Sequence, residues 1–179
     1  ETALPAFEAA RLLNPHTPEI DYALARLEAS QGNAEAARTY ANQAVAKKSN
    51  YTGAILFLAQ LSLDEGKLKD AIQSVLSALV FEQQNSNLLY QLGVLYLADK
   101  DYPNATLAFE AAIRVTPEFA NAQFFLGQAY AYQERYEDAL ALFEVLAQEN
   151  PDNEVVKNAL TALSEGKNPF TGIEAPQGE

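Results

Sequence analysis

Apolar residues recur along this chain at helical spacing, in pairs of stripes that are separated by short polar breaks. The clearest pair lies in residues 86–117. Its first stripe consists of Leu88, Leu89, Leu92, Leu95 and Tyr96. After a polar break at residues 99–101, its second stripe consists of Ala105, Phe109, Ala112 and Ile113. Residues three and four positions apart share one face of a helix, so the pattern predicts two amphipathic helices joined by a short turn.

The same pattern returns every 34 residues. Leu92–Gly93 matches Leu126–Gly127, and Phe109 matches Phe143. Units of this length begin at residues 18, 52, 86, 120 and 154, and their seventh residues are Leu24, Leu58, Leu92, Leu126 and Leu160. Such a period indicates a repeat array in which each unit buries its apolar face against its neighbours. We expect an all-α fold, an α-solenoid of antiparallel helix pairs, with four complete units at 18–51, 52–85, 86–119 and 120–153.

The two ends of the chain fit this frame only in part. Residues 1–14 match the second half of an earlier unit, and the chain begins at Glu1 and contains no Met, so we expect a fragment of a longer protein. Residues 154–165 keep a single apolar stripe and predict a C-terminal capping helix. Residues 166–179 contain Gly and Pro and few apolar residues, which predicts a flexible tail. Alternatively, Phe170 and Ile173 form a short docking element within it.

Small residues occupy fixed positions in the units and have a packing reason. Two antiparallel helices approach closely only where their side chains are small. We therefore expect Gly93 and Gly127 on the first helices to face Ala105 and Ala139 on the second helices. Two segments also have the composition of helix starts, with a capping Thr, a Pro and an acid: Thr17–Glu19 and Thr116–Glu118.

The charge of the chain narrows the classes of partner. It carries 24 acidic and 12 basic residues, a net charge of −12. A nucleic-acid binder needs a basic face, and a peripheral membrane protein needs clusters of Lys and Arg, so we expect neither. The acidity predicts a solvated surface or, alternatively, attraction to a basic partner. The chain has no Cys and no apolar run near 18 residues, which predicts a soluble domain without disulfides and leaves its compartment open.

The repeat resembles the tetratricopeptide repeat family. The match rests on the 34-residue period and on a Leu-Gly…Tyr…Ala…Phe…Ala…Pro pattern. It is nearly complete at Leu92, Gly93, Tyr96, Ala105, Phe109, Ala112 and Pro117, and again at Leu126, Gly127, Tyr130, Ala139, Phe143 and Pro151. The first two units are weaker, since Glu28 and Ser62 replace the Tyr, and the family's Trp at the fourth position is absent. The resemblance implies a right-handed superhelix whose first helices line a concave groove that binds a peptide or a partner protein.

The groove positions of the family fall on a defined set of residues. The candidate peptide-binding residues are Tyr22, Arg26, Leu56, Gln60, Asn87, Tyr90, Val94, Asn121, Phe124, Gln128 and Tyr132. Of these residues Arg26 alone is cationic, so the carboxylate clamp of chaperone-binding members is not expected here. The set predicts an aromatic and apolar strip flanked by amides, which pair with the backbone of an extended peptide. Alternatively, Tyr22, Tyr90 and Phe124 simply pack against neighbouring repeats.

The residues offer little for catalysis. His16 is the single histidine and lies in the turn before Pro18, without the partners that a metal site needs. We therefore predict a non-catalytic interaction scaffold with no cofactor and no metal. Two alternatives remain: self-association through Leu4, Phe7 and Leu12 of the N-terminal half-unit, or a docking arm of a larger enzyme or membrane protein. We expect the cytoplasm as the default compartment, with the outside of the cytoplasm as the alternative for a membrane-anchored or exported protein.

Overall fold

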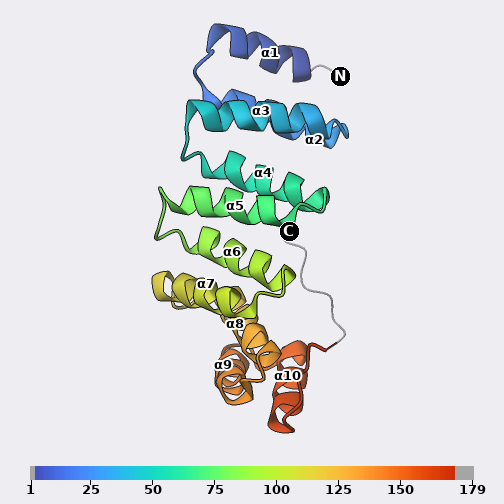
Figure 1. Cartoon of the computed structure of the whole chain (residues 1–179), viewed down its shortest axis with the longest axis vertical. Helices are drawn as coiled ribbons and strands as arrows, with labels where there is room; N and C mark the ends of the chain where they lie inside the picture. Colours follow the sequence, from blue (N-terminus) through green and yellow to red (C-terminus); the bar gives the residue numbers. More distant parts are fainter. Residues whose placement is uncertain (1–2, 172–179) are drawn as a thin grey trace. The chain divides into compact units, whose positions relative to one another are not determined.

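The computed structural model describes residues 3–171, and this part of the chain consists of helices without any strand. Figure 1 shows the ten helices in order. They are α1 (Ala3–Leu13), α2 (Pro18–Ser30), α3 (Ala34–Lys47), α4 (Thr52–Asp64), α5 (Leu68–Leu79), α6 (Ser86–Ala98), α7 (Tyr102–Val115), α8 (Ala120–Tyr132), α9 (Tyr136–Glu149) and α10 (Glu154–Ser164). The even-numbered helices begin 34 residues apart, at the residues where the repeat frame starts each unit.

The chain divides into two compact units, residues 1–83 and residues 84–179. In the first unit each helix from α1 to α5 contacts the next one. In the second unit the same holds from α6 to α10, and the first helices α6 and α8 also touch each other. Both units are therefore stacks of antiparallel helix pairs, which confirms the all-α solenoid class. The handedness of a longer superhelix stays a prediction.

The turns that follow the even-numbered helices share one backbone feature. A single residue adopts a left-handed conformation: Gly32, Gly66 and Gly166 with φ near +70 to +83°, and Lys100 and Glu134 with φ of 60°. Three residues after α6, the N–H of Asp101 donates back to Tyr96 O at 2.8 Å, and Arg135 and Tyr130 repeat this bond after α8 at 2.9 Å. Such bonds satisfy the last carbonyl groups of a helix. Glycine is the residue that takes this conformation without strain, yet two turns form without it.

The predicted helix starts at the Thr-Pro-Glu segments differ in outcome. At Thr17 the helix begins at the next residue, but the Thr side chain makes no capping hydrogen bond. At Thr116 the prediction is wrong, because Thr116 is the C-cap residue directly after α7 and α8 begins only at Ala120. Side-chain caps occur instead at Asn85 and Asn153, whose Oδ1 atoms accept two backbone N–H groups each.

The glycines of the first helices provide space for aromatic rings. A Cβ atom on Gly93 would lie 2.5 Å from the Phe109 ring, and one on Gly127 would lie 2.7 Å from the Phe143 ring. Both rings are fully buried. Ala105 and Ala139, which the sequence placed opposite these glycines, are also buried, but the nearest atoms to each glycine belong to the Phe ring. The close approach therefore serves a ring rather than a second small residue.

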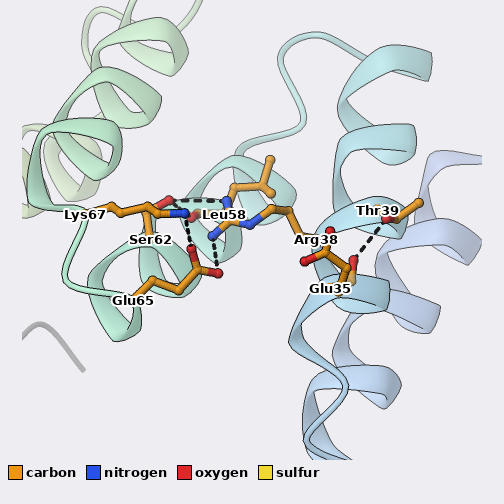
Figure 2. Close-up of polar contacts among 7 residues, drawn as sticks. All are labelled: Glu35, Arg38, Thr39, Leu58, Ser62, Glu65 and Lys67. Atoms are coloured by element: carbon orange, nitrogen blue, oxygen red, sulfur yellow. Dashed lines mark hydrogen bonds and ion pairs between the residues drawn. The ribbon is translucent and has the colours of Figure 1, made fainter.

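Successive repeats are joined by polar contacts at equivalent positions. In the first unit, Arg38 on α3 donates to Glu65 at the end of α4 at 2.9 Å. Figure 2 shows this bond, with Lys67 approaching the same carboxylate at 2.8 Å and Arg38 also reaching Ser62. In the second unit, Gln133 donates to Thr106 at 2.8 Å across the same separation of 27 residues. The same link between repeats is thus an ion pair in one unit and a neutral hydrogen bond in the other.

Candidate functional site

In the first unit, the predicted groove residue Tyr22 is held by aromatic packing. Its ring meets Tyr51 and Phe57 edge-on, with centroid distances of 5.4 and 6.0 Å. Gly53 on α4 leaves room for the Tyr22 ring, which lies 3.4 Å from where a Cβ atom would stand. Arg26 is exposed, with its guanidinium carbon 5.9 Å from the centre of the same ring. The Tyr22 ring is therefore only half-buried, and Arg26, one turn further along α2, is exposed to solvent.

The other two predicted residues of the first unit lie on α4. Leu56 and Gln60 are both half-buried. The Gln60 amide donates to the carboxylate of Asp64, one turn further along, at 2.9 Å. This bond is exposed, so exchanging it for a bond to a ligand would cost little free energy.

In the second unit, Asn87 on α6 and Asn121 on α8 occupy the same place in successive repeats. Both side chains are exposed. Tyr90 lies on α6, three residues after Asn87. Its ring packs against Phe119, Phe125 and Phe109, with centroid distances of 5.1, 5.8 and 6.0 Å. Burial raises the pKa of the Tyr90 hydroxyl above its ordinary value. Asn87 and Tyr90 are carried by α6 and Asn121 by α8, and these two helices contact each other.

Two predicted groove residues do not reach the surface. Val94 and Gln128 are each only 3% exposed. Val94 belongs to the apolar core that includes Phe109 and Leu126. The Oε1 atom of Gln128 has no hydrogen-bond partner within the described residues. In this structure both side chains contribute to packing rather than to a contact surface.

The last two predicted residues, Phe124 and Tyr132 on α8, are covered by the chain itself. Phe170, which follows α10, is 4% exposed and lies 5.9 Å from Phe124 and 6.4 Å from Tyr132, measured between ring centres. The Tyr132 hydroxyl donates to the Phe170 carbonyl oxygen at 3.1 Å. The sequence predicted a flexible tail from residue 166 and, as an alternative, a docking element at Phe170 and Ile173. Phe170 is docked, whereas Ile173 lies outside the described residues.

A buried carboxylate, Asp21 on α2, is a feature that the sequence analysis missed. It is fully buried and forms ion pairs with Arg11 of α1, at 3.0 Å, and with Lys47 of α3. These two cations also line a groove of about 680 Å³ between α1 and α3, together with Glu8. Because Asp21 already pairs with both cations, this groove is a structural feature rather than an anion site. Its signal in the sequence is an acid at the fourth position, where the next two units have Ile55 and Leu89.

The described part of the chain shows neither a metal-binding cluster nor a membrane-spanning helix. Between residues 3 and 171, no cluster of three His, Cys, Asp or Glu side chains is arranged to hold a metal ion. His16 is exposed in the turn between α1 and α2. Within the same residues, none of the helices combines the length and the apolar character needed to cross a membrane.

Comparison with known proteins agrees with this arrangement. The family model described as "Tetratricopeptide repeat" matches residues 1–52 and 90–154, more than half of the chain. Superkiller protein 3 of Schizosaccharomyces pombe (strain 972 / ATCC 24843) is 39% identical over 72 residues. The match includes 40% of this chain but only 5% of the length of that protein.

Solved structures resemble the chain over most of its length. A crystal structure of MamA has a TM-score of 0.76 at 20% identity and covers 85% of this chain and 83% of its own. A crystal structure of YrrB, described as a TPR protein with an unusual peptide-binding site, has a TM-score of 0.76 at 19% identity. It covers 94% of this chain and 89% of its own. At these identities the likeness speaks for the fold alone.

Proposed function

Because the chain belongs to the tetratricopeptide repeat family, we propose that it is a protein-interaction scaffold that binds an extended segment of a partner protein along its first helices. The family and the fold support binding of a protein partner in general terms. The specific site that we propose is the face of α6 and α8, with Asn87, Tyr90 and Asn121 as its centre. In the first unit, Tyr22 and Leu56 occupy the position of Tyr90, and Arg26 and Gln60 lie one turn further along the same helices.

The observation that supports this site best is that an exposed asparagine recurs one repeat later, at Asn87 and Asn121. Both amides are exposed at the same position of successive repeats, on helices that contact each other. A side-chain amide offers both a donor and an acceptor, which matches the alternating N–H and C=O groups of an extended peptide. Tyr90 supplies a ring that is already fixed by its neighbours, so little conformational entropy is lost when a ligand packs on it.

The charge of the chain indicates the chemistry of the ligand. The net charge is −12, and Arg26 is the one cation among the proposed contact residues. An anionic peptide would be repelled by the overall field, whereas a neutral or basic one would be attracted. The description of YrrB as having a peptide-binding site shows that a chain of this fold, in that protein, binds a peptide. We therefore expect a neutral or basic extended peptide.

A selection experiment tests the site. Peptides that bind the immobilised chain are selected from a random library, and the amide signals of the chain are then followed by NMR as a selected peptide is added. We expect the largest shift changes at Asn87, Tyr90 and Asn121. Changes confined to the second helices α7 and α9 would reject this face as the binding site.

Self-association is a second candidate, and exposed apolar side chains on α1 favour it. Leu12 is 85% exposed and Leu13 is 81% exposed, and Phe7 is also exposed. Apolar surface of this kind is often covered in an assembly. Sedimentation velocity over a range of concentrations tests the idea, with Leu12→Glu as the comparison. A concentration-dependent dimer that Leu12→Glu abolishes supports it, and a chain that stays monomeric throughout excludes it.

A further inference from the structure

We propose that residues 168–170 (Asn-Pro-Phe) are an internal ligand of the last repeat, and that the pocket they fill accepts the same motif from a partner peptide. This inference rests on the proposed function, because the pocket lies at the predicted groove residues Phe124 and Tyr132. It names the chemistry of the peptide: an Asn, a Pro and an aromatic residue in a tight turn. The internal segment would then regulate access to the pocket by competition.

The pocket is a place for one aromatic ring. The Phe170 ring is packed against Phe124 and Phe143, with both centroid distances at 5.9 Å, and Phe124 and Phe143 are themselves 5.4 Å apart. The apolar core around these rings also contains Val156, Ala159 and Leu163 of α10. A ring that enters here is thus enclosed by α8, α9 and α10.

The preceding repeat shows why this space exists. There, Tyr90 and Phe109 form a cluster of three rings with Phe125, with centroid distances of 6.0, 6.0 and 5.8 Å. Tyr90 corresponds to Phe124 one repeat later, and Phe109 corresponds to Phe143. The residue that corresponds to Phe125 is Ala159, which has no ring. The last repeat therefore lacks the third ring of the cluster within its helices, and Phe170 supplies it from outside them.

Two hydrogen bonds join the segment to α8, and a third closes the turn within it. The Asn168 amide group donates to the carbonyl oxygen of Ala131 at 3.1 Å, and its Oδ1 accepts the N–H of Phe170 at 2.8 Å. The Tyr132 hydroxyl donates to the Phe170 carbonyl oxygen at 3.1 Å. Asn suits this place because it both accepts the turn bond and donates to Ala131, whereas Asp could only accept. Pro169 restricts the backbone between them and lowers the entropy lost on docking.

The segment is joined to the repeat by a short connection. Ser164 ends α10, Gly166 adopts a φ of +70°, and Lys167 is exposed. A tether of a few residues gives an effective concentration on the order of millimolar, so the internal segment outcompetes a free peptide of the same sequence. Removing its ring should therefore open the pocket to that peptide.

The test measures binding of a fluorescein-labelled peptide with the sequence of residues 165–171 (EGKNPFT) to the full chain by anisotropy. We expect the Phe170→Ala chain to bind this peptide at least about tenfold more tightly than the unmodified chain does, because the internal competitor is lost. The same peptide with Ala in place of Phe should not bind the variant, and Asp in place of Asn should weaken binding. Equal affinity of the two chains, or failure of a folded Phe170→Ala chain to bind, would overturn the proposal.

A second variant covers the case in which Phe170→Ala unfolds the last repeat, as judged by loss of helical circular dichroism. Asn168→Ala keeps the ring but removes the bond to Ala131 and the turn bond, so it should bind the peptide more tightly than the unmodified chain. No gain in affinity would show that Phe170 is a permanent part of the core, which contradicts the proposal. These outcomes can be distinguished from those of the proposed function. If a selected peptide changes the NMR signals of Asn87 and Asn121, the proposed groove is supported even when the proposal for the Phe170 pocket is rejected.

Discussion

The ring of Phe109 lies against Gly93 so closely that a Cβ atom at this glycine would be 2.5 Å from the ring edge. The next repeat has the same arrangement between Phe143 and Gly127, at 2.7 Å. In each of these two repeats, the Phe ring of the second helix thus occupies the space that a side chain would need at the glycine of the first helix. This contact explains why the third and fourth repeats have Gly at the position where the first two repeats have Ala25 and Ala59.

Adding one methyl group at Gly93 should destabilise the chain. Although Ala is a better helix former than Gly by about 1 kcal/mol, overpacking a filled core costs roughly 1–3 kcal/mol. We expect Gly93→Ala to lower the free energy of unfolding, and Gly127→Ala to lower it less, because two of its three nearest ring atoms are 3.2 Å away. Urea denaturation measures both.

Gly53→Ala is the matched control for this prediction. Its Cβ atom would have its nearest neighbour at 3.4 Å, an ordinary contact with the Tyr22 ring, so the gain in helix propensity should dominate. We expect Gly53→Ala to be neutral or stabilising. A Gly93→Ala chain as stable as Gly53→Ala would mean that the Phe109 ring moves aside freely.

The hydrogen bonds of Gln133 should be important for the second unit. Its Nε2 donates to Thr106 at 2.8 Å, to Ala129 O at 3.0 Å and to Tyr102 O at 3.3 Å. Gln133→Ala leaves the hydroxyl of the buried Thr106 without this donor, which we expect to cost about 1–3 kcal/mol of unfolding free energy.

The double variant Gln133→Leu with Thr106→Val removes both partners of that bond and should be less destabilising than Gln133→Ala, because no buried polar group is left unpaired. Chemical denaturation compares the two chains. If Gln133→Ala unfolds at the same denaturant concentration as the unmodified chain, the bond contributes nothing to the stacking of α7 and α8.

Tyr130 should make the stability of the chain sensitive to alkaline pH. Burial, followed by its 2.8 Å hydrogen bond to Glu110, raises the pKa of Tyr130 to about 12. In the unfolded chain a tyrosine titrates near pH 10, so the folded state holds this proton more tightly. The stabilisation is complete below about pH 10 and is lost as the pH rises towards 12.

The measurement is the free energy of unfolding of the unmodified chain and of Tyr130→Phe at several pH values in that range. The curve of the unmodified chain should fall more steeply, since Phe has no proton to lose. Parallel curves would show that the pKa of Tyr130 is the same in the folded and unfolded states.

The positions of the first helices could be predicted from the sequence, because a fixed 34-residue period reflects packing that every unit repeats. Features that break the period could not. Asp21 is polar at a position that packs inside the array, and only the structure shows that Arg11 and Lys47 converge on it. Thr116–Glu118 has the composition of a helix start but forms the turn after α7, because local composition does not determine where the next helix meets its neighbours.

The candidate site was predictable in outline only. The family resemblance placed Asn87 and Asn121 among the groove residues, and both side chains are exposed in the structure, while their role in binding stays a prediction. The resemblance could not show that Val94 and Gln128 are buried, since burial depends on how the neighbouring helices pack. Nor could the sequence place Phe170 on Phe124. The space for Phe170 exists because Ala159 stands where the preceding repeat has Phe125, and only the structure shows that Phe125 completes a cluster of rings.

The affinity of a selected peptide for groove variants tests the central claim most directly. Calorimetry should compare the unmodified chain with the double variant Asn87→Ala and Asn121→Ala, and with Asn42→Ala, an exposed amide on the second helix α3. Loss of two hydrogen bonds at about 0.5–1.5 kcal/mol each predicts a Kd that is roughly 5- to 150-fold weaker for the double variant. Asn42→Ala should bind as the unmodified chain does. An unchanged Kd for a folded double variant would contradict the proposal that the first helices α6 and α8 bind the partner.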